Sequence, residues 1–196
     1  MAGNLSGVRI RHSQADRGLD FYQTPPVATR ALIRAERLPH GLWEPHCGYG
    51  SIAEVLLDAG HAVCATDIEH RGYRHQSGTG NFLKTKRVPP GVEGIVMNPP
   101  FSMAAIHVRH GLTICPFVCA LLRLSFLEAG NDKTEAGRAR LWCLDRGYLA
   151  RVHVFRQRLP FMHREGWTGK KSTSTVAFAW FVFDGDHSGP PTIHRI

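Results

Sequence analysis

Short apolar runs alternate with longer amphipathic segments along most of this chain. Four runs have the length and composition of buried strands, and they lie at 42–44, 62–66, 94–97 and 117–124. Four amphipathic segments have helical spacing, and they lie at 27–37, 51–59, 103–112 and 133–145. Two further strands are predicted near 150–155 and 175–183, with a polar loop between them, whereas 68–93 is predicted to be mostly irregular.

This order of elements predicts the fold class. Strands that alternate with helices indicate an α/β protein with a doubly wound, mostly parallel sheet. The last two strands have no room for a crossover helix between them, so we expect an antiparallel hairpin at one edge of the sheet. The 196 residues suit one domain, which we place at 20–184, between a flexible basic arm (1–19) and a C-terminal tail (185–196).

The composition narrows the range of partners. The formal net charge is +8, and arginine outnumbers lysine, which favours polyanions such as nucleic acids. No apolar run approaches the roughly 20 residues of a membrane span. The five cysteines include no CxxC pair, and the twelve histidines offer no convincing third ligand beside the helix-spaced His107 and His110. We therefore expect a cytoplasmic protein with no membrane segment, disulfide framework or metal.

The strand at 94–97 is followed by Asn98-Pro99-Pro100-Phe101. The side-chain carbonyl of Asn98 and the backbone carbonyl of Pro99 are two acceptors on a chain that proline stiffens. The ring of Phe101 offers a flat surface beside them. This arrangement suits a planar base whose exocyclic amine donates both hydrogens to the two carbonyls. An ordinary Asn-Pro turn is the alternative for these residues alone.

The first strand ends at Glu44, and a turn containing Gly48 and Gly50 joins it to a helix. These glycines allow the backbone to approach a ligand at the helix N-terminus. The turn lacks the GxGxxG of dinucleotide sites and the Lys of a P-loop, and Glu44 would repel a pyrophosphate but attract an ammonium. Asp67 ends the second strand about 20 residues later, where a carboxylate can accept both ribose hydroxyls of an adenosine. A plain turn and a helix cap are the alternatives.

Four motifs occur in a fixed order along the chain. They are Tyr22-Gln23-Thr24-Pro25, Glu44 to Gly50, the acidic strand end at Asp67, and Asn98 to Phe101. In this order they resemble the S-adenosylmethionine-dependent N6-adenine DNA methyltransferases, and most closely the small forms of phages and prophages. The resemblance covers residues 20–184 and implies a class I methyltransferase domain with a Rossmann-like fold.

The resemblance also implies roles by position. Asn81 stands where the family usually has Asp, so its neutral amide should accept the adenine amine of the cofactor more weakly. Phe82 would flank that adenine, with a core aromatic as the alternative. The residues implied to bind S-adenosyl-L-methionine are Tyr22, Thr24, Pro25, Glu44, Pro45, Gly48, Gly50, Asp67, Ile68, Asn81, Phe82 and Asn98.

The implied reaction is direct transfer of the methyl group to the N6 amine of adenine. The implied catalytic residues are Asn98, Pro99, Pro100 and Phe101. A target base in duplex DNA must leave the stack, and Phe101 would then stack on it. The chain has no Pro-Cys nucleophile of the kind that methylation of a ring carbon in cytosine requires.

A basic loop between the last two predicted strands is the candidate nucleic-acid surface. Its lysines suit phosphates, and its tryptophan could stack on a base. An exposed hairpin loop with no ligand is the alternative. The residues predicted to bind substrate are Phe101, Arg158, Arg164, Trp167, Lys170 and Lys171.

Two alternative functions stay open. An Asn-Pro-Pro-aromatic motif also suits the planar amine of adenine in RNA or of glutamine in a protein. The chain could also be a catalytically silent nucleic-acid-binding module, because Asn81 replaces the expected Asp. The sequence predicts neither the recognition site nor the oligomeric state.

Overall fold

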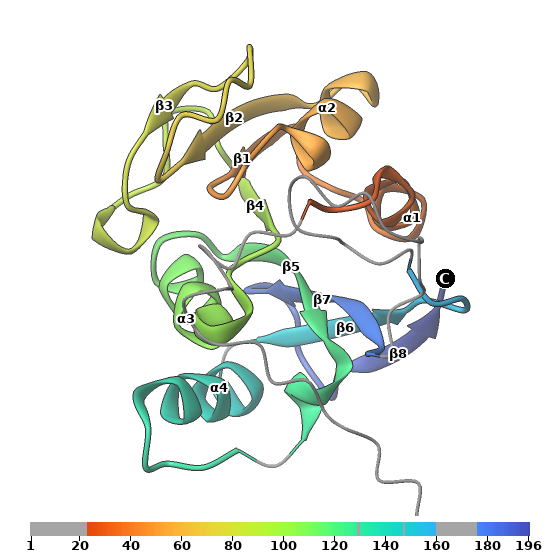
Figure 1. Ribbon diagram of the computed structural model, residues 1–196. Coiled ribbons are helices and arrows are strands. Elements are labelled where there is room, and N and C mark those ends of the chain that lie inside the picture. The colour runs from red at the N-terminus through yellow and green to blue at the C-terminus, as the bar shows by residue number, and fades with distance from the viewer. Residues whose placement is uncertain (1–22, 129, 147, 160–175) are drawn as a thin grey trace, which may run out of the picture.

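An eight-stranded sheet forms the centre of the computed structural model, which describes residues 23–128, 130–146, 148–159 and 176–196 (Figure 1). The strands are β1 (Gly41–Glu44), β2 (Ala62–Asp67), β3 (Gly78–Thr79), β4 (Gly94–Met97), β5 (Phe117–Arg123), β6 (Leu149–Val154), β7 (Phe178–Asp184) and β8 (Thr192–Arg195). Their order across the sheet is β3-β2-β1-β4-β5-β7-β6-β8. Strand β7 runs antiparallel to both of its neighbours, and the other described pairings are parallel.

In the part of the chain that the structure describes, two helices cover each face of the sheet (Figure 1). Helices α1 (Pro26–Ala35) and α2 (Ser51–Asp58) lie on one face, and α3 (Ala104–Ile114) and α4 (Glu135–Arg146) lie on the other. Helix α1 starts with a proline at its first position, where no backbone N–H is needed. Three short 3₁₀ helices complete the elements of the described residues: η2 (Phe82–Lys84), η3 (Phe101–Met103) and η4 (Leu124–Leu127).

Strand β5 shows why both faces must be covered. Val118 and Leu122 belong to the core on the side of α3 and α4, whereas Cys119 and Leu121 belong to the core on the side of α1 and α2. Successive side chains of a strand point to opposite faces, so an unbroken apolar run buries both faces. The prediction of a doubly wound, mostly parallel α/β sheet is confirmed.

The antiparallel part of the sheet differs from the prediction in its position. Strands β6 and β7 pair as predicted, but β7 lies inside the sheet between β5 and β6. The edge beyond β6 is β8, which pairs with β6 in parallel. Residues 185–196, which the sequence analysis set apart as a tail, therefore include a strand of the sheet. All four residues of β8 are exposed, so no alternation of apolar and polar residues revealed this strand.

The strand order places the carboxyl ends of β1, β2 and β4 at one edge of the sheet. From β1 the chain continues outward to β2 and β3, and it then returns to β4 on the other side of β1. The gap between β1 and β4 is therefore the switch point, where α/β sheets bind ligands. No helix among the described residues is long and apolar enough to cross a membrane.

Candidate active site

A pocket of about 470 Å³ opens at this switch point. Its walls come from the carboxyl ends of β1, β2 and β4, from η2 and η3, and from the segment that precedes α1. The predicted site residues that line it are Thr24, Glu44, Pro45, Asp67, Ile68, Asn81, Phe82, Asn98, Pro99, Pro100 and Phe101. The structure thus brings together residues from four motifs that are far apart in the sequence.

Asp67 connects the end of β2 to the glycine turn that follows β1. Its Oδ2 accepts a hydrogen bond from the backbone N–H of Gly48 at 2.9 Å, and its Oδ1 accepts one from Glu69 at 3.1 Å. Gly48 has a φ of 53°, a left-handed conformation that glycine adopts without strain. The Asp67 carboxylate is 6% exposed and lines the pocket, so its position is fixed before any ligand arrives.

Glu44 is a buried carboxylate in the floor of the same pocket. Its Oε2 accepts a hydrogen bond from the backbone N–H of Ala53 in the first turn of α2, at 2.8 Å. Burial, and to a smaller extent the negative charge of Asp67, raise the pKa of Glu44 well above its ordinary value. A cation in the pocket would favour the ionised form of Glu44.

Gly50 and Pro25 were predicted to bind the cofactor, but neither residue lines the pocket. Gly50 has a φ of 84°, and a Cβ at this position would lie 2.2 Å from the ring of Tyr73. The glycine is therefore needed for the turn and for the packing of Tyr73. Pro25 is the residue before α1, where its fixed φ starts the helix.

Asn98 follows β4 and lines the pocket beside the prolines. Its Nδ2 donates a hydrogen bond to the hydroxyl of Thr24, with 3.0 Å between the two heavy atoms. Thr24 is 4% exposed and precedes α1. A residue from another motif thus orients the amide. The Nδ2 of Asn98 points toward Thr24, and the carbonyl oxygen is on the other side of the amide group.

Phe101 begins η3 and packs between two side chains. Its ring lies 5.4 Å from that of Phe178 on β7, and the guanidinium carbon of Arg123 lies 4.9 Å from its centroid. Phe101 lines the pocket on the side of Pro99 and Pro100. The ring of Phe101 therefore lines the same pocket as Asn98, and a cation lies near this ring.

Asn81 and Phe82 line the pocket at the start of η2. The Oδ1 of Asn81 accepts a hydrogen bond from the backbone N–H of Leu83 at 2.9 Å and thereby caps η2. Phe82 is buried, and its ring meets those of Trp43 and His110 edge-on, with centroids 5.2 and 4.9 Å apart. Phe82 thus belongs to the core and also lines the pocket, and its contact with an adenine stays a prediction.

Two histidines of the pocket were not predicted as site residues. The rings of His46 and His107 lie 4.8 Å apart, and both side chains line the pocket near Phe82. Burial lowers the pKa of His46 well below its ordinary value, and His107 lowers it further. Neither ring nitrogen of His46 has a hydrogen-bond partner among the residues that the structure describes. The position of His46 inside the glycine turn was the signal that could have identified it.

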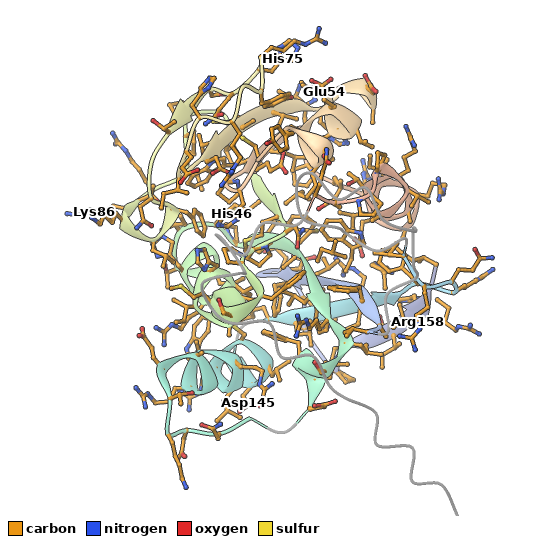
Figure 2. All side chains as sticks on the ribbon, in the orientation of Figure 1. His46, Glu54, His75, Lys86, Asp145 and Arg158 are labelled. Carbon is orange, nitrogen blue, oxygen red and sulfur yellow. The ribbon has the colours of Figure 1, made fainter. Side chains whose placement is uncertain are left out.

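The predicted substrate surface is only partly represented. Arg158 is exposed and lines neither this pocket nor the cavity described below. Figure 2 shows it well apart from His46. The other predicted positions, Tyr22, Arg164, Trp167, Lys170 and Lys171, lie outside the described residues. Within the described ranges, no group of three or more His, Cys, Asp or Glu side chains could hold a metal ion.

Comparison with known proteins shows likeness in structure only. No family model matches the sequence, and no curated protein matches it. Among solved structures, a protein of Pyrococcus horikoshii proposed to be an RNA methyltransferase has a TM-score of 0.58 and 11% identity, with coverage of 85% of this chain and 87% of that chain. A protein of Streptococcus thermophilus proposed to be a hemolysin has a TM-score of 0.57 and 13% identity, with coverage of 86% and 67%.

A third structure is much longer than this chain. It is the type IIG restriction endonuclease BpuSI, with a TM-score of 0.52 and 16% identity, and the match covers 90% of this chain and 27% of that chain. At such identities the likeness concerns the fold alone. The shared fold is a Rossmann-like α/β fold.

Proposed function

We propose that this protein transfers a methyl group from S-adenosylmethionine to the N6 amine of adenine in DNA. The observation that carries the proposal is that Asn98 and Asp67 line one pocket, with the Asn98 amide held by Thr24. The order of the four motifs and the class I methyltransferase fold support the same reaction. The net charge of +8 favours a nucleic-acid substrate over a protein.

The residues of the pocket fit S-adenosylmethionine. Asp67 offers a fixed carboxylate to a ribose diol, and Phe82 with the exposed side chain of Ile68 offers apolar surface to an adenine. The buried carboxylate of Glu44 suits a positively charged group better than a phosphate. When bound, the cofactor supplies a methyl group that its positive sulfur activates.

Asn98 and Pro99 act on the amine that receives the methyl group. The N6 lone pair of adenine is delocalised into the ring, so the free amine is a poor nucleophile. The Asn98 Oδ1 and the Pro99 carbonyl accept its two N–H bonds and favour a more tetrahedral nitrogen, whose lone pair would attack the methyl carbon in line. The bond from this carbon to sulfur would break, S-adenosylhomocysteine would leave, and the methylated amine would lose one proton to water. Phe101 stacks on the base, and the hydrogen bond to Thr24 fixes the orientation of the Asn98 amide. The protein therefore contributes mainly by orienting the reacting groups.

Adenine in RNA and glutamine in protein present the same planar NH₂ group and are the alternative substrates. Labelled cofactor should be incubated with duplex DNA, single-stranded DNA, RNA and protein. We expect transfer to DNA and recovery of N6-methyladenine by mass spectrometry after digestion. Asn98→Ala is the matched control, and it should lower the rate about 10²- to 10³-fold while cofactor binding persists, by analogy with the loss of one oxyanion-hole donor.

Two results would contradict this assignment. Methyl transfer to RNA or to protein in preference to DNA would keep the chemistry and replace the substrate. Cofactor binding without transfer to any of the four substrates would support the silent binding module. Equal loss of cofactor binding and of turnover in Asn98→Ala, measured by calorimetry and by the transfer assay, would remove the separate role of Asn98.

A further inference from the structure

A second cavity, of about 320 Å³, adjoins the candidate active site. Phe101 and Ser102 line both cavities, so the turn after β4 forms the wall between them. The remainder of the second cavity comes from the start of α3, from the end of β5, from η4, and from the N-terminal half of α4 with the loop before it. A ligand that extends past Phe101 from the active site would enter this cavity.

The lining of the second cavity has a positive charge. Its charged side chains are Arg123 and Arg140, and no described carboxylate lines it. Hydroxyl and amide groups provide the other polar atoms, from Ser102, Ser125, Asn131 and Thr134. Such a set of donors suits an oxyanion, which arginine binds with two parallel N–H bonds.

Among the described residues, the acidic side chains near α4 do not line this cavity. Glu135, in the first turn of α4, lies 3.3 Å from the guanidinium of Arg109 on α3 and does not line the cavity. The active-site pocket has the opposite character, because Glu44 and Asp67 line it, and its one lining arginine, Arg71, pairs with Glu69 at 3.1 Å. The two adjoining cavities thus favour ligands of opposite charge.

Arg123 connects the second cavity to the site of methyl transfer. It is the last residue of β5, and its guanidinium carbon lies 4.9 Å from the centroid of the Phe101 ring. Stacking uses the flat face of a guanidinium, and the N–H donors lie in its plane, so they can bind a further ligand while the contact persists. An oxyanion bound by Arg123 would lie next to the ring that stacks on the target base.

The wall formed by α4 is held in place by close packing. A Cβ at Gly137 would lie 1.9 Å from the backbone carbonyl oxygen of Asn131, so the loop before α4 rests directly on the helix. The backbone N–H of Gly137 also donates to the hydroxyl of Thr134 at 3.0 Å. The polar groups of this wall are therefore positioned by the fold and need little reorganisation to bind a ligand.

We propose that this cavity is a phosphate subsite. Arg123 and Arg140 bind a phosphodiester group of the substrate next to the base whose amine is methylated. The inference rests on the proposed function, since it assumes that the target base stacks on Phe101. It also deepens that function, because a phosphate subsite beside Phe101 selects a nucleic acid over the amide of a protein.

The test measures binding separately from catalysis. A fluorescent oligodeoxynucleotide is titrated with the full chain in the presence of S-adenosylhomocysteine, at several salt concentrations, and binding is followed by anisotropy. Arg123→Gln and Arg140→Gln should each weaken binding about tenfold, and each should lower the slope of log K against log salt by about one. Arg146→Gln is the matched control, because this exposed arginine ends α4 at the helix end away from the cavity.

Arg146→Gln removes the same charge and should change affinity and slope much less. Arg123→Lys should recover part of the affinity, because it restores the charge without the planar fork. Circular dichroism checks the folding of each variant. If Arg123→Gln does not fold, oligonucleotide binding by Arg140→Gln tests the subsite. Equal effects of all three glutamine variants would overturn the subsite, because net charge alone would then explain them.

The subsite and the proposed function can fail independently. If the wild type binds the oligonucleotide through Arg123 and Arg140 but methylates nothing, the subsite stands and the proposed function fails. If DNA is methylated and both glutamine variants bind and react as the control does, the proposed function stands and the subsite fails. Methylation of a glutamine peptide without oligonucleotide binding would overturn both.

Discussion

The side-chain amide of Asn98 donates a hydrogen bond to the hydroxyl of Thr24, a residue 74 positions earlier in the chain. The bond joins the turn after β4 to the segment before α1, and both residues line the pocket. The resemblance implies that Thr24 binds the cofactor. The structure supports an additional role, which is to hold the amide that would bind the target amine.

Thr24→Val tests this orienting role with a side chain of nearly the same shape. We expect kcat to fall about 10- to 100-fold, because a loosely held amide spends less time in the reactive geometry. The KM for the cofactor should change by less than about threefold. Steady-state kinetics of methyl transfer measures both parameters, and Thr24→Ser, which keeps the hydroxyl, is the control.

The opposite effects on kcat and KM would show that Thr24 acts mainly by binding the cofactor. In that case Thr24→Val would raise the KM for S-adenosylmethionine and leave kcat unchanged. A variant that changes neither parameter would show that the hydrogen bond does not contribute to the reaction.

The strands that position the site could be predicted from the sequence because each is a short apolar run, which neighbouring residues alone reveal. Glu44, Asp67 and Asn98 each end or follow a short apolar run, and parallel strands bring such ends to one edge of a sheet. Connectivity alone then placed the three side chains in one pocket. The same local rules located the helices, with bounds that differ from the observed ones by a few residues.

Other parts of the site depend on tertiary packing, which no local pattern encodes. His107 enters the pocket because α3 packs against η2, and the contact of Arg123 with Phe101 requires β4 and β5 to be neighbours. Spacing along the chain gives no signal for either contact. Strand β8 escaped prediction for another reason, because its exposed residues lack the alternation that identifies a half-buried strand.

Glu44→Gln should stabilise the protein without cofactor and weaken cofactor binding. The amide keeps an acceptor for the Ala53 N–H but removes a buried carboxyl, whose raised pKa reflects the cost of its charge. We expect a higher Tm, and a Kd for S-adenosylmethionine that is about tenfold larger because a cation loses its counter-charge. Thermal unfolding and calorimetric titration measure the two effects.

The pH dependence of this variant has a definite sign. A carboxyl whose pKa is raised in the folded state contributes most to stability below its unfolded pKa, and that contribution is lost as pH rises. The gain in Tm of Glu44→Gln over the wild type should therefore grow from acidic to neutral pH. Unchanged cofactor affinity would assign Glu44 to the capping of α2 alone.

His46→Phe should make the protein more resistant to mild acid. Burial lowers the pKa of His46 in the folded state, so the unfolded chain binds more protons and stability falls as pH drops through about 6.5. Removing this imidazole should reduce the change of the unfolding free energy with pH by up to about 1.4 kcal/mol per pH unit. The phenyl ring keeps the contacts with Phe82 and His107. Urea unfolding across a pH series measures the slope.

His40 offers a comparison for this experiment, since it is exposed and lies outside the pocket. A similar change of slope in His40→Phe and His46→Phe would contradict the explanation by burial. The explanation would also be wrong if the unfolding free energy of His46→Phe changed with pH as steeply as that of the wild type.

Glu36→Ala should lower the free energy of unfolding by about 3 kcal/mol, because the buried His153 loses this acceptor and the half-buried Arg151 keeps only Asp184. The Oε1 of Glu36, at the end of α1, accepts hydrogen bonds from Arg151 at 2.5 Å and from His153 at 2.6 Å on β6. Burial raises the pKa of Glu36, but the bonds from His153 and Arg151 outweigh it, and the net shift is downward. The contribution of Glu36 is therefore present above about pH 4.5 and is lost as pH falls through the lowered pKa.

The exposed pair of Glu135 and Arg109 is the control for this prediction. Exposed ion pairs contribute about 1 kcal/mol or less, so Glu135→Ala should lower the free energy of unfolding much less than Glu36→Ala does. Denaturant unfolding at neutral and at acidic pH measures both variants. The difference between Glu36→Ala and the wild type should shrink in acid, where the wild-type carboxylate is protonated. A difference that stays constant with pH would mean that lost packing at the end of α1, and not the ionised network with β6, accounts for the effect.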